Sequence, residues 1–120
     1  MACILFVDDD PYTLETLTKA VELFGHQAML ASSGEEALRL AASTPADLIF
    51  VDLMLPDIDG LQVLDQIKLV AKNGQVPIYV LSAAADRNYS EQALALGAQA
   101  YLTKPLRLQT LLDIIQKHLE

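Results

Sequence analysis

The stretch from Leu48 to Asp52 most narrows what this chain can fold into. Four consecutive apolar residues, 48–51, run directly into the aspartate, and Pro56 and Gly60 mark a turn shortly afterwards. An uninterrupted apolar run that is rich in β-branched and aromatic residues is typical of a strand buried on both faces. Such strands belong to parallel sheets covered by helices, and ligands bind those sheets outside the carboxyl ends of the strands. Asp52 is therefore predicted to lie at a ligand-binding edge.

Similar apolar runs alternate with segments of helical spacing along the whole chain. The strands are predicted at 3–7, 27–31, 48–51, 78–81 and 100–103. The five helices are predicted to end at Gly25, at Thr44 and Pro45, at Asn73 and Gly74, at Gly97, and at Leu119. The fourth of them is predicted to start near Asp86 or Ser90. Five strands that alternate with five helices indicate one α/β domain, 1–120, with a doubly wound parallel sheet.

Composition excludes several classes of protein. No apolar run approaches the roughly 18 residues of a membrane span, and no basic segment followed by an apolar one suggests a secretion signal. The net charge of −8 without a Lys/Arg cluster disfavours direct binding to nucleic acid. Cys3 is the only cysteine, which favours a cytoplasmic location and a packing role. His26 and His118 lack ligand-spaced partners and are expected at the surface.

Several acidic and hydroxyl residues fit local roles at helix starts. Asp10 can cap the first helix, and Ser33 with Glu36 forms a capping-box pattern before the second. Asp57 and Asp59 are expected to shape the turn around Gly60 rather than to bind a ligand.

A second set of polar residues follows the predicted strands directly: Asp8 and Asp9, Asp52, Ser82 and Lys104. If the strands are parallel, these residues share one edge of the sheet. Two carboxylates about 4 Å apart repel by roughly 4 kcal/mol at an effective dielectric near 20, so three need a counter-charge. Hard oxygen ligands without cysteine or paired histidine favour Mg²⁺ or Mn²⁺ over zinc. A carboxylate beside such an ion can attack phosphorus and form an aspartyl phosphate.

Four motifs in order carry a family resemblance. They are Phe-Val-Asp-Asp-Asp-Pro at 6–11, Val-Asp-Leu-Met-Leu-Pro-Asp-Ile-Asp-Gly at 51–60, Leu-Ser-Ala at 81–83, and Tyr-Leu-Thr-Lys-Pro at 101–105. The chain resembles, over nearly its whole length, the receiver domain of two-component response regulators. The resemblance implies a flavodoxin-like fold with strand order 2-1-3-4-5, and a switch module rather than a turnover enzyme.

By resemblance, Asp52 is the phosphoacceptor and takes its phosphoryl group from a sensor histidine kinase, a histidine phosphotransfer protein or a small-molecule donor. Asp9 would ligate Mg²⁺ directly, Asp8 would act mostly through water, and the Met54 backbone carbonyl would complete the protein's ligands. All of these roles are implied by the resemblance to the family.

The switch residues are implied in the same way. Lys104 would pair with the phosphoryl oxygens, and Ser82 with the Ala83 backbone would bind them on activation. Tyr101 would turn inward as Ser82 moves, and the peptide before Pro105 would be cis. The fourth helix, fifth strand and fifth helix would then present a face to an output domain or effector protein.

Simpler roles remain open for these residues. Asp8 and Asp10 could only cap a helix, Ser82 could cap the fourth helix, Lys104 could be solvated, and Tyr101 could be plain core. Two other functions also remain. A haloacid-dehalogenase-type phosphatase would need an Asp-x-Asp-x-Thr pattern after the first strand, and a flavodoxin would need Gly, Ser and Thr there.

Two departures from the family pattern carry expectations. Met54 and Ala84 stand two positions beyond Asp52 and Ser82, and neither side chain can hold an attacking water, so the phosphorylated form should persist. Residues 98–100 lack the acidic side chains of receivers that dimerise through the fourth helix, fifth strand and fifth helix, which disfavours that dimer.

Overall fold

Five parallel strands form the central layer, in the order β2-β1-β3-β4-β5. The computed structural model describes residues 2–72, 74–82 and 87–119. The strands are β1 Cys3–Val7, β2 Gln27–Ala31, β3 Leu48–Asp52, β4 Ile78–Ser82 and β5 Ala100–Thr103. The helices are α1 Pro11–Leu23, α2 Gly34–Ser43, α3 Gly60–Val70, α4 Arg87–Ala95 and α5 Leu108–Leu119. The predicted doubly wound sheet and its strand order are confirmed.

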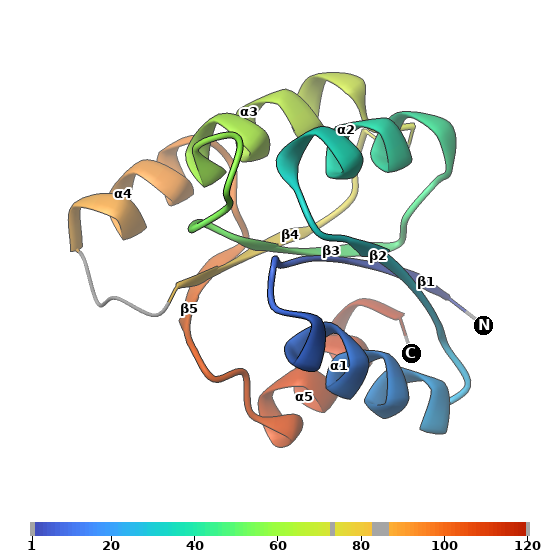
Figure 1. The fold of residues 1–120 in the computed structure, drawn as a ribbon. Coiled ribbons are helices and arrows are strands. Elements are labelled where there is room, and N and C mark those ends of the chain that lie inside the picture. Colours follow the sequence, from blue (N-terminus) through green and yellow to red (C-terminus); the bar gives the residue numbers. More distant parts are fainter. Residues whose placement is uncertain (1, 73, 83–86, 120) are drawn as a thin grey trace.

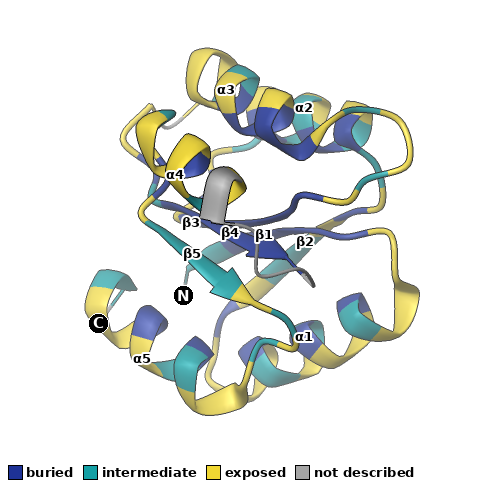
Figure 2. Cartoon of the chain, turned by 90° about the vertical axis from the view of Figure 1, so that its left-hand side faces the viewer, coloured by how far each residue is buried: buried dark blue, intermediate teal, exposed yellow. Residues whose placement is uncertain are grey.

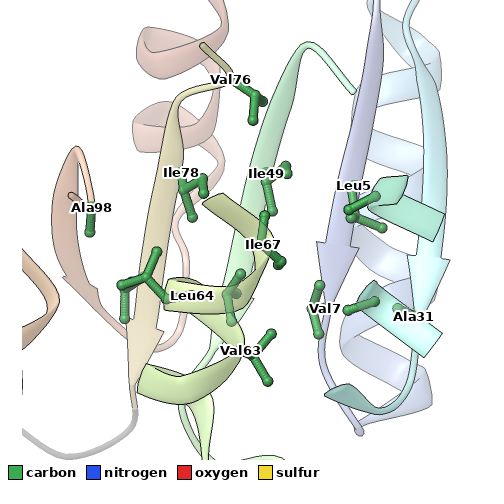
Figure 3. Close-up of a cluster of buried hydrophobic side chains, with 14 of the residues drawn as sticks. Leu5, Val7, Ala31, Ile49, Val63, Leu64, Ile67, Val76, Ile78 and Ala98 are labelled. Carbon is green, nitrogen blue, oxygen red and sulfur yellow. The ribbon is translucent and has the colours of Figure 1, made fainter. Parts of the chain in front are cut away.

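Helices cover both faces of the sheet, with α2, α3 and α4 on one side and α1 and α5 on the other (Figure 1). Alternate residues of each central strand serve the two sides: Leu5 and Ile49 join the core under α2 and α3, whereas Phe6 and Phe50 join the core against α1 and α5. Figure 3 shows Ile49 of β3 and Ile78 of β4, both in the core under α2 and α3, beside Ile67 of α3. Burial on both faces explains why β3 is apolar throughout.

The outer surfaces of the helices are exposed, and buried residues face the sheet (Figure 2). No helix within the described parts of the chain has both the length and the apolar character that a membrane span requires.

Most predicted helix ends are confirmed. Asp10 caps α1 and accepts a hydrogen bond from the Tyr12 amide, and Gly25 follows the helix with a φ of 83° that favours glycine. Ser33 caps α2 by accepting from the Glu36 amide at 3.2 Å. The reciprocal bond of the capping box differs, because the Glu36 carboxylate accepts from the Ser32 amide instead of that of Ser33.

The end of α3 was predicted too late along the chain. The helix ends at Val70 with Ala71 as its cap, ahead of the predicted end at Asn73 and Gly74; Asn73 lies outside the described residues. The Lys72 amide leaves the helix direction and donates to the Ala41 carbonyl of α2. A contact with a neighbouring helix therefore ends α3 before the local Asn-Gly signal.

The expectation that both histidines lie at the surface was wrong. His26 is buried, and its Nδ1 accepts a hydrogen bond from the Ala2 amide at 3.2 Å. His118 is half-buried, with its Nε2 2.7 Å from the Tyr79 hydroxyl. Both partners are distant in sequence, so no local pattern around the histidines indicated them.

Candidate functional site

Asp8 and Asp52 lie side by side at the carboxyl ends of two adjacent strands. Val7 pairs with Val51 in the β1–β3 register, so the next residue of each strand emerges at the same edge of the sheet. Both aspartates are buried, whereas Asp9 is exposed. One carboxylate oxygen from each of Asp8, Asp9 and Asp52 lies within 4.8 Å of the others. The predicted convergence of these three residues is confirmed as geometry.

Lys104 reaches the same point from the connection between β5 and α5. Its Nζ lies 2.7 Å from Asp8 Oδ2 and 2.8 Å from Asp52 Oδ2. Its backbone amide donates to the Ser82 carbonyl at 2.8 Å, which places the start of this connection against the end of β4. The Lys104–Pro105 peptide is cis, as predicted. We call Asp8, Asp9, Asp52 and Lys104 the strand-end cluster.

The two buried carboxylates share one bonding pattern. Asp8 Oδ1 accepts from the Asp10 amide at 2.9 Å, and Asp52 Oδ1 accepts from the Met54 amide at 3.0 Å. The second oxygen of each carboxylate faces the Lys104 ammonium. Each carboxylate is thus oriented by one backbone N–H and shares a single cation with the other.

Burial and charge act against each other in this cluster. Burial raises the pKa of Asp52, against the opposing effects of the Lys104 ammonium and the Met54 amide, and the charge of Asp8 raises it further. Burial by itself would lower the pKa of Lys104, but hydrogen bonds to Asp52 and Asp8 outweigh it, so the pKa is raised. Lys104 therefore stays charged. At their formal charges, three carboxylates and one ammonium leave the cluster with two surplus negative charges.

The donor atoms of the cluster fit a hard divalent cation. All three side chains offer carboxylate oxygens, and Asp8 Oδ2 is buried with only the Lys104 ion pair as a partner among the described residues. A divalent ion would cancel the two surplus charges. Carboxylate oxygens in small number suit Mg²⁺ or Mn²⁺. This chemistry agrees with the metal predicted from the sequence.

The remaining predicted residues lie around the cluster or outside the described part. Ser82 is buried at the end of β4, next to the site. Met54, two residues after Asp52, is 66% exposed. Tyr101 is half-buried on β5 and packs against the core under α2, α3 and α4. Ala83 and Ala84 lie outside the described residues.

A groove of about 450 Å³ opens beside the cluster, between the start of α1 and the connection that follows β5. Tyr12 and Thr13 line it on one side, and Lys104, Pro105 and Leu106 on the other. Tyr12 is 79% exposed. The site is therefore reachable from outside over a surface that is mainly apolar.

Sequence reasoning missed the partner of Asp57. Its carboxylate accepts hydrogen bonds from the Gly34 amide at 2.8 Å and from the Glu35 amide at 3.1 Å, so it caps the start of α2 from another part of the chain. Asp59 has the local role expected near Gly60, because it caps α3 by accepting from the Leu61 amide. Nothing in the sequence around Asp57 distinguished these two roles.

Comparison with known proteins gives a consistent result. Residues 4–116 match the model of a family described as the response regulator receiver domain. Transcriptional regulatory protein KdpE of Mycobacterium tuberculosis is 40% identical over 114 residues, which cover 93% of this chain and 48% of KdpE. The chain thus spans about half the length of that relative. Protein PilH of Pseudomonas aeruginosa is 32% identical, over 96% of this chain and 95% of PilH.

Among solved structures, the receiver domain of sensor histidine kinase PA1611 from Pseudomonas aeruginosa matches with a TM-score of 0.86 and 31% identity, over 98% of this chain and 96% of that one. That structure has a magnesium ion coordinated in its active site cleft.

Proposed function

This chain belongs to the response regulator receiver domain family, and we propose that it is a phosphorylation-controlled switch whose phosphoacceptor is Asp52. Membership of this family supports the switch over the phosphatase and flavodoxin interpretations. The proposed donor is the phosphohistidine of a sensor histidine kinase or of a histidine phosphotransfer protein. As inferred from the sequence, we propose that the protein is cytoplasmic and that this domain does not bind nucleic acid directly.

The observation that carries this proposal is the strand-end cluster. Asp52 Oδ2 is one of the two carboxylate oxygens that face Lys104, while Oδ1 is fixed by the Met54 amide. An oriented carboxylate can attack phosphorus, so that a P–O bond to Asp52 forms while the P–N bond of phosphohistidine breaks. The imidazole leaves with a proton from solvent. The Lys104 ammonium is placed to neutralise charge on the transferred group, which is the protein's main task in phosphoryl transfer.

Asp8, Asp9, Asp52 and the Met54 backbone carbonyl are the groups we propose to hold Mg²⁺ or Mn²⁺. The ion would supply positive charge to the phosphoryl oxygens. The residues themselves contribute orientation: Asp8 is fixed by the Asp10 amide and by Lys104 before any ion arrives. The magnesium ion in the PA1611 receiver domain supports this part of the proposal.

The switching step is proposed to start at Ser82. Its position at the end of β4, beside Asp52, would let its hydroxyl and the Ala83 backbone bind a phosphoryl oxygen. Tyr101 lies on β5, two residues before the strand ends. It would then turn inward and change the face formed by α4, β5 and α5. We propose that an output domain or effector protein binds this face.

We also propose that the phosphorylated form is long-lived, because an exposed methionine at position 54 and an alanine at 84 cannot hold an attacking water. The measurement is the loss of the phosphoryl group over time in purified protein without a phosphatase. Rapid loss of the phosphoryl group from wild type under these conditions would contradict this expectation.

Intact-mass measurement tests the proposed function. Purified protein is incubated with a small phosphoryl donor in the presence of Mg²⁺, and the measurement is repeated with EDTA and with Asp52→Asn. We expect wild type to gain the mass of one phosphoryl group only with Mg²⁺, and the variant to gain none. Equal labelling of wild type and Asp52→Asn would show that Asp52 is not the acceptor.

A further inference from the structure

The loop at residues 53–59, between β3 and α3, leaves the sheet at the strand-end cluster and carries Met54. The base of the loop is closed by the Gly60 amide, which donates to the Leu53 carbonyl at 3.2 Å. A Cβ at position 60 would lie 2.3 Å from Leu53 Cα, so this closure requires glycine. At its start the loop is held by the bond from the Met54 amide to Asp52 Oδ1.

Farther along, Asp57 fastens this loop to another element. Its two carboxylate oxygens accept from the amides of Gly34 and Glu35, the first two residues of α2. The first N–H groups of a helix have no partner within the helix, and the helix dipole favours a negative charge there. These backbone bonds lower the pKa of Asp57, so the carboxylate stays ionised at neutral pH.

Packing leaves little freedom around this contact. A Cβ at Gly34 would lie 2.8 Å from Val63 Cγ2 and 3.1 Å from Ile58, so the start of α2 touches both the loop and α3. Ile58 itself is half-buried against the core under α2, α3 and α4. The loop is therefore fixed at the Met54 amide by Asp52 and, farther along, at Asp57 by α2.

We propose that Asp57 is a positioning residue for the metal site: by binding α2, it holds the loop in the conformation that presents the Met54 carbonyl to Mg²⁺. This inference rests on the proposed function. Asp57 contacts no member of the strand-end cluster in the described structure, so its effect passes through the loop backbone. Metal binding and the Asp57–α2 bonds then favour the same loop conformation, and each strengthens the other.

The first test compares the Mg²⁺ affinity of Asp57→Ala and Asp57→Asn with that of Asp59→Asn, measured by amide chemical shifts in a Mg²⁺ titration. Asp59→Asn is the matched control, because it removes the same charge from the same loop and asparagine still caps α3. We expect the Mg²⁺ Kd to rise about 3- to 10-fold in Asp57→Ala, below the roughly 10- to 100-fold seen for direct partners of metal ligands. Asp57→Asn keeps one acceptor and should fall between Asp57→Ala and wild type.

The second test needs no variant. Mg²⁺ added to wild type should slow hydrogen exchange of the Gly34 and Glu35 amides, although neither residue belongs to the cluster. Unchanged exchange of both amides, or an equal loss of Mg²⁺ affinity in Asp57→Asn and Asp59→Asn, would overturn the positioning role. So would an unaltered Mg²⁺ Kd in Asp57→Ala while wild type binds normally. A wild type that binds no Mg²⁺ would overturn the proposed function and this inference together.

Discussion

Asp52 and Asp57 belong to the same strand-to-helix connection, but their carboxylates are in opposite electrostatic situations. Asp52 is buried beside Asp8 and shares one lysine with it, and burial raises its pKa. Asp57 is exposed, binds two helix N–H groups, and has a lowered pKa. The same residue type is therefore held in an unfavourable charged state at one end of the loop and in a favourable one at the other.

This contrast extends to two sets of aspartates. Asp10, Asp57 and Asp59, which we call the capping aspartates, each bind backbone amides at the start of a helix. The strand-end cluster instead concentrates three carboxylates around one ammonium. Carboxylates that cap helices stabilise the fold without help, whereas a cluster with surplus charge is stabilised only when something positive binds to it. A surplus of charge is thus the feature that separates the site from the supporting structure.

The largest expected effect comes from removing the cation of the cluster. Lys104→Met should lower the rate of phosphorylation of Asp52 by about 100-fold, the usual cost of losing one group that stabilises developing charge. The rate is measured by intact mass over time with a small donor and Mg²⁺. Lys68→Met is the control, because Lys68 bonds the Gly97 carbonyl and lies outside the cluster. A rate within a few-fold of wild type in Lys104→Met would remove Lys104 from the proposed chemistry.

Removing a carboxylate from the cluster should stabilise the metal-free protein. Asp9→Asn relieves repulsion with Asp8 and Asp52, which we expect to raise the free energy of unfolding by about 1 kcal/mol, the repulsion of two charges near 4 Å in a watery environment. Urea denaturation in EDTA measures this change. A lower free energy of unfolding in Asp9→Asn would mean that repulsion between the carboxylates does not destabilise the protein.

Removing a capping aspartate should destabilise the protein, in contrast to removing a carboxylate from the cluster. Asp59→Ala should lower the free energy of unfolding by about 1 kcal/mol, because the Leu61 amide loses its acceptor at the start of α3. Asp59→Asn should stay close to wild type, since asparagine caps equally well. The same urea denaturation measures both. If alanine and asparagine were equivalent, the cap would not contribute to stability.

The smallest effect concerns pH, and its sign should differ between the two carboxylates. The folded-state pKa of Asp57 lies below its ordinary 3.8, so its contribution is complete above that value and is lost as pH falls through the lowered pKa. The advantage of wild type over Asp57→Asn should therefore shrink in acid. The pKa of Asp52 is raised, so its ionisation costs stability as pH rises through it, and metal-free Asp52→Asn should gain on wild type over that range. Denaturation midpoints across a pH series would show both trends, and parallel curves would contradict them.

The sheet and the strand-end cluster could be predicted from the sequence for a simple physical reason. Apolar runs buried on both faces identify the strands of a parallel sheet, and parallel strands bring the residues that follow them to one edge. Asp8, Asp52 and Lys104 meet there although they are far apart in the chain. Once the strands were assigned, the cluster required no further information.

Contacts between separate connections could not be predicted in the same way. Asp57 stands in a Pro-Asp-Ile-Asp-Gly turn, where both aspartates have the local signature of turn formers, yet only the fold brings α2 within reach of one of them. His26 was misplaced because its partner, the Ala2 amide, comes from the start of the chain. In both cases the deciding partner is a backbone amide, and side-chain patterns carry no signal for it.

The most direct test of the account is the Mg²⁺ dependence of the free energy of unfolding, measured by urea denaturation for wild type and for Asp9→Asn. If surplus charge at the strand-end cluster requires a divalent ion, wild type should gain about 2.7 kcal/mol at a Mg²⁺ concentration 100 times its Kd, and Asp9→Asn should gain little over the same range. A wild-type protein whose stability does not respond to Mg²⁺, or an Asp9→Asn variant that responds as strongly as wild type, would contradict it.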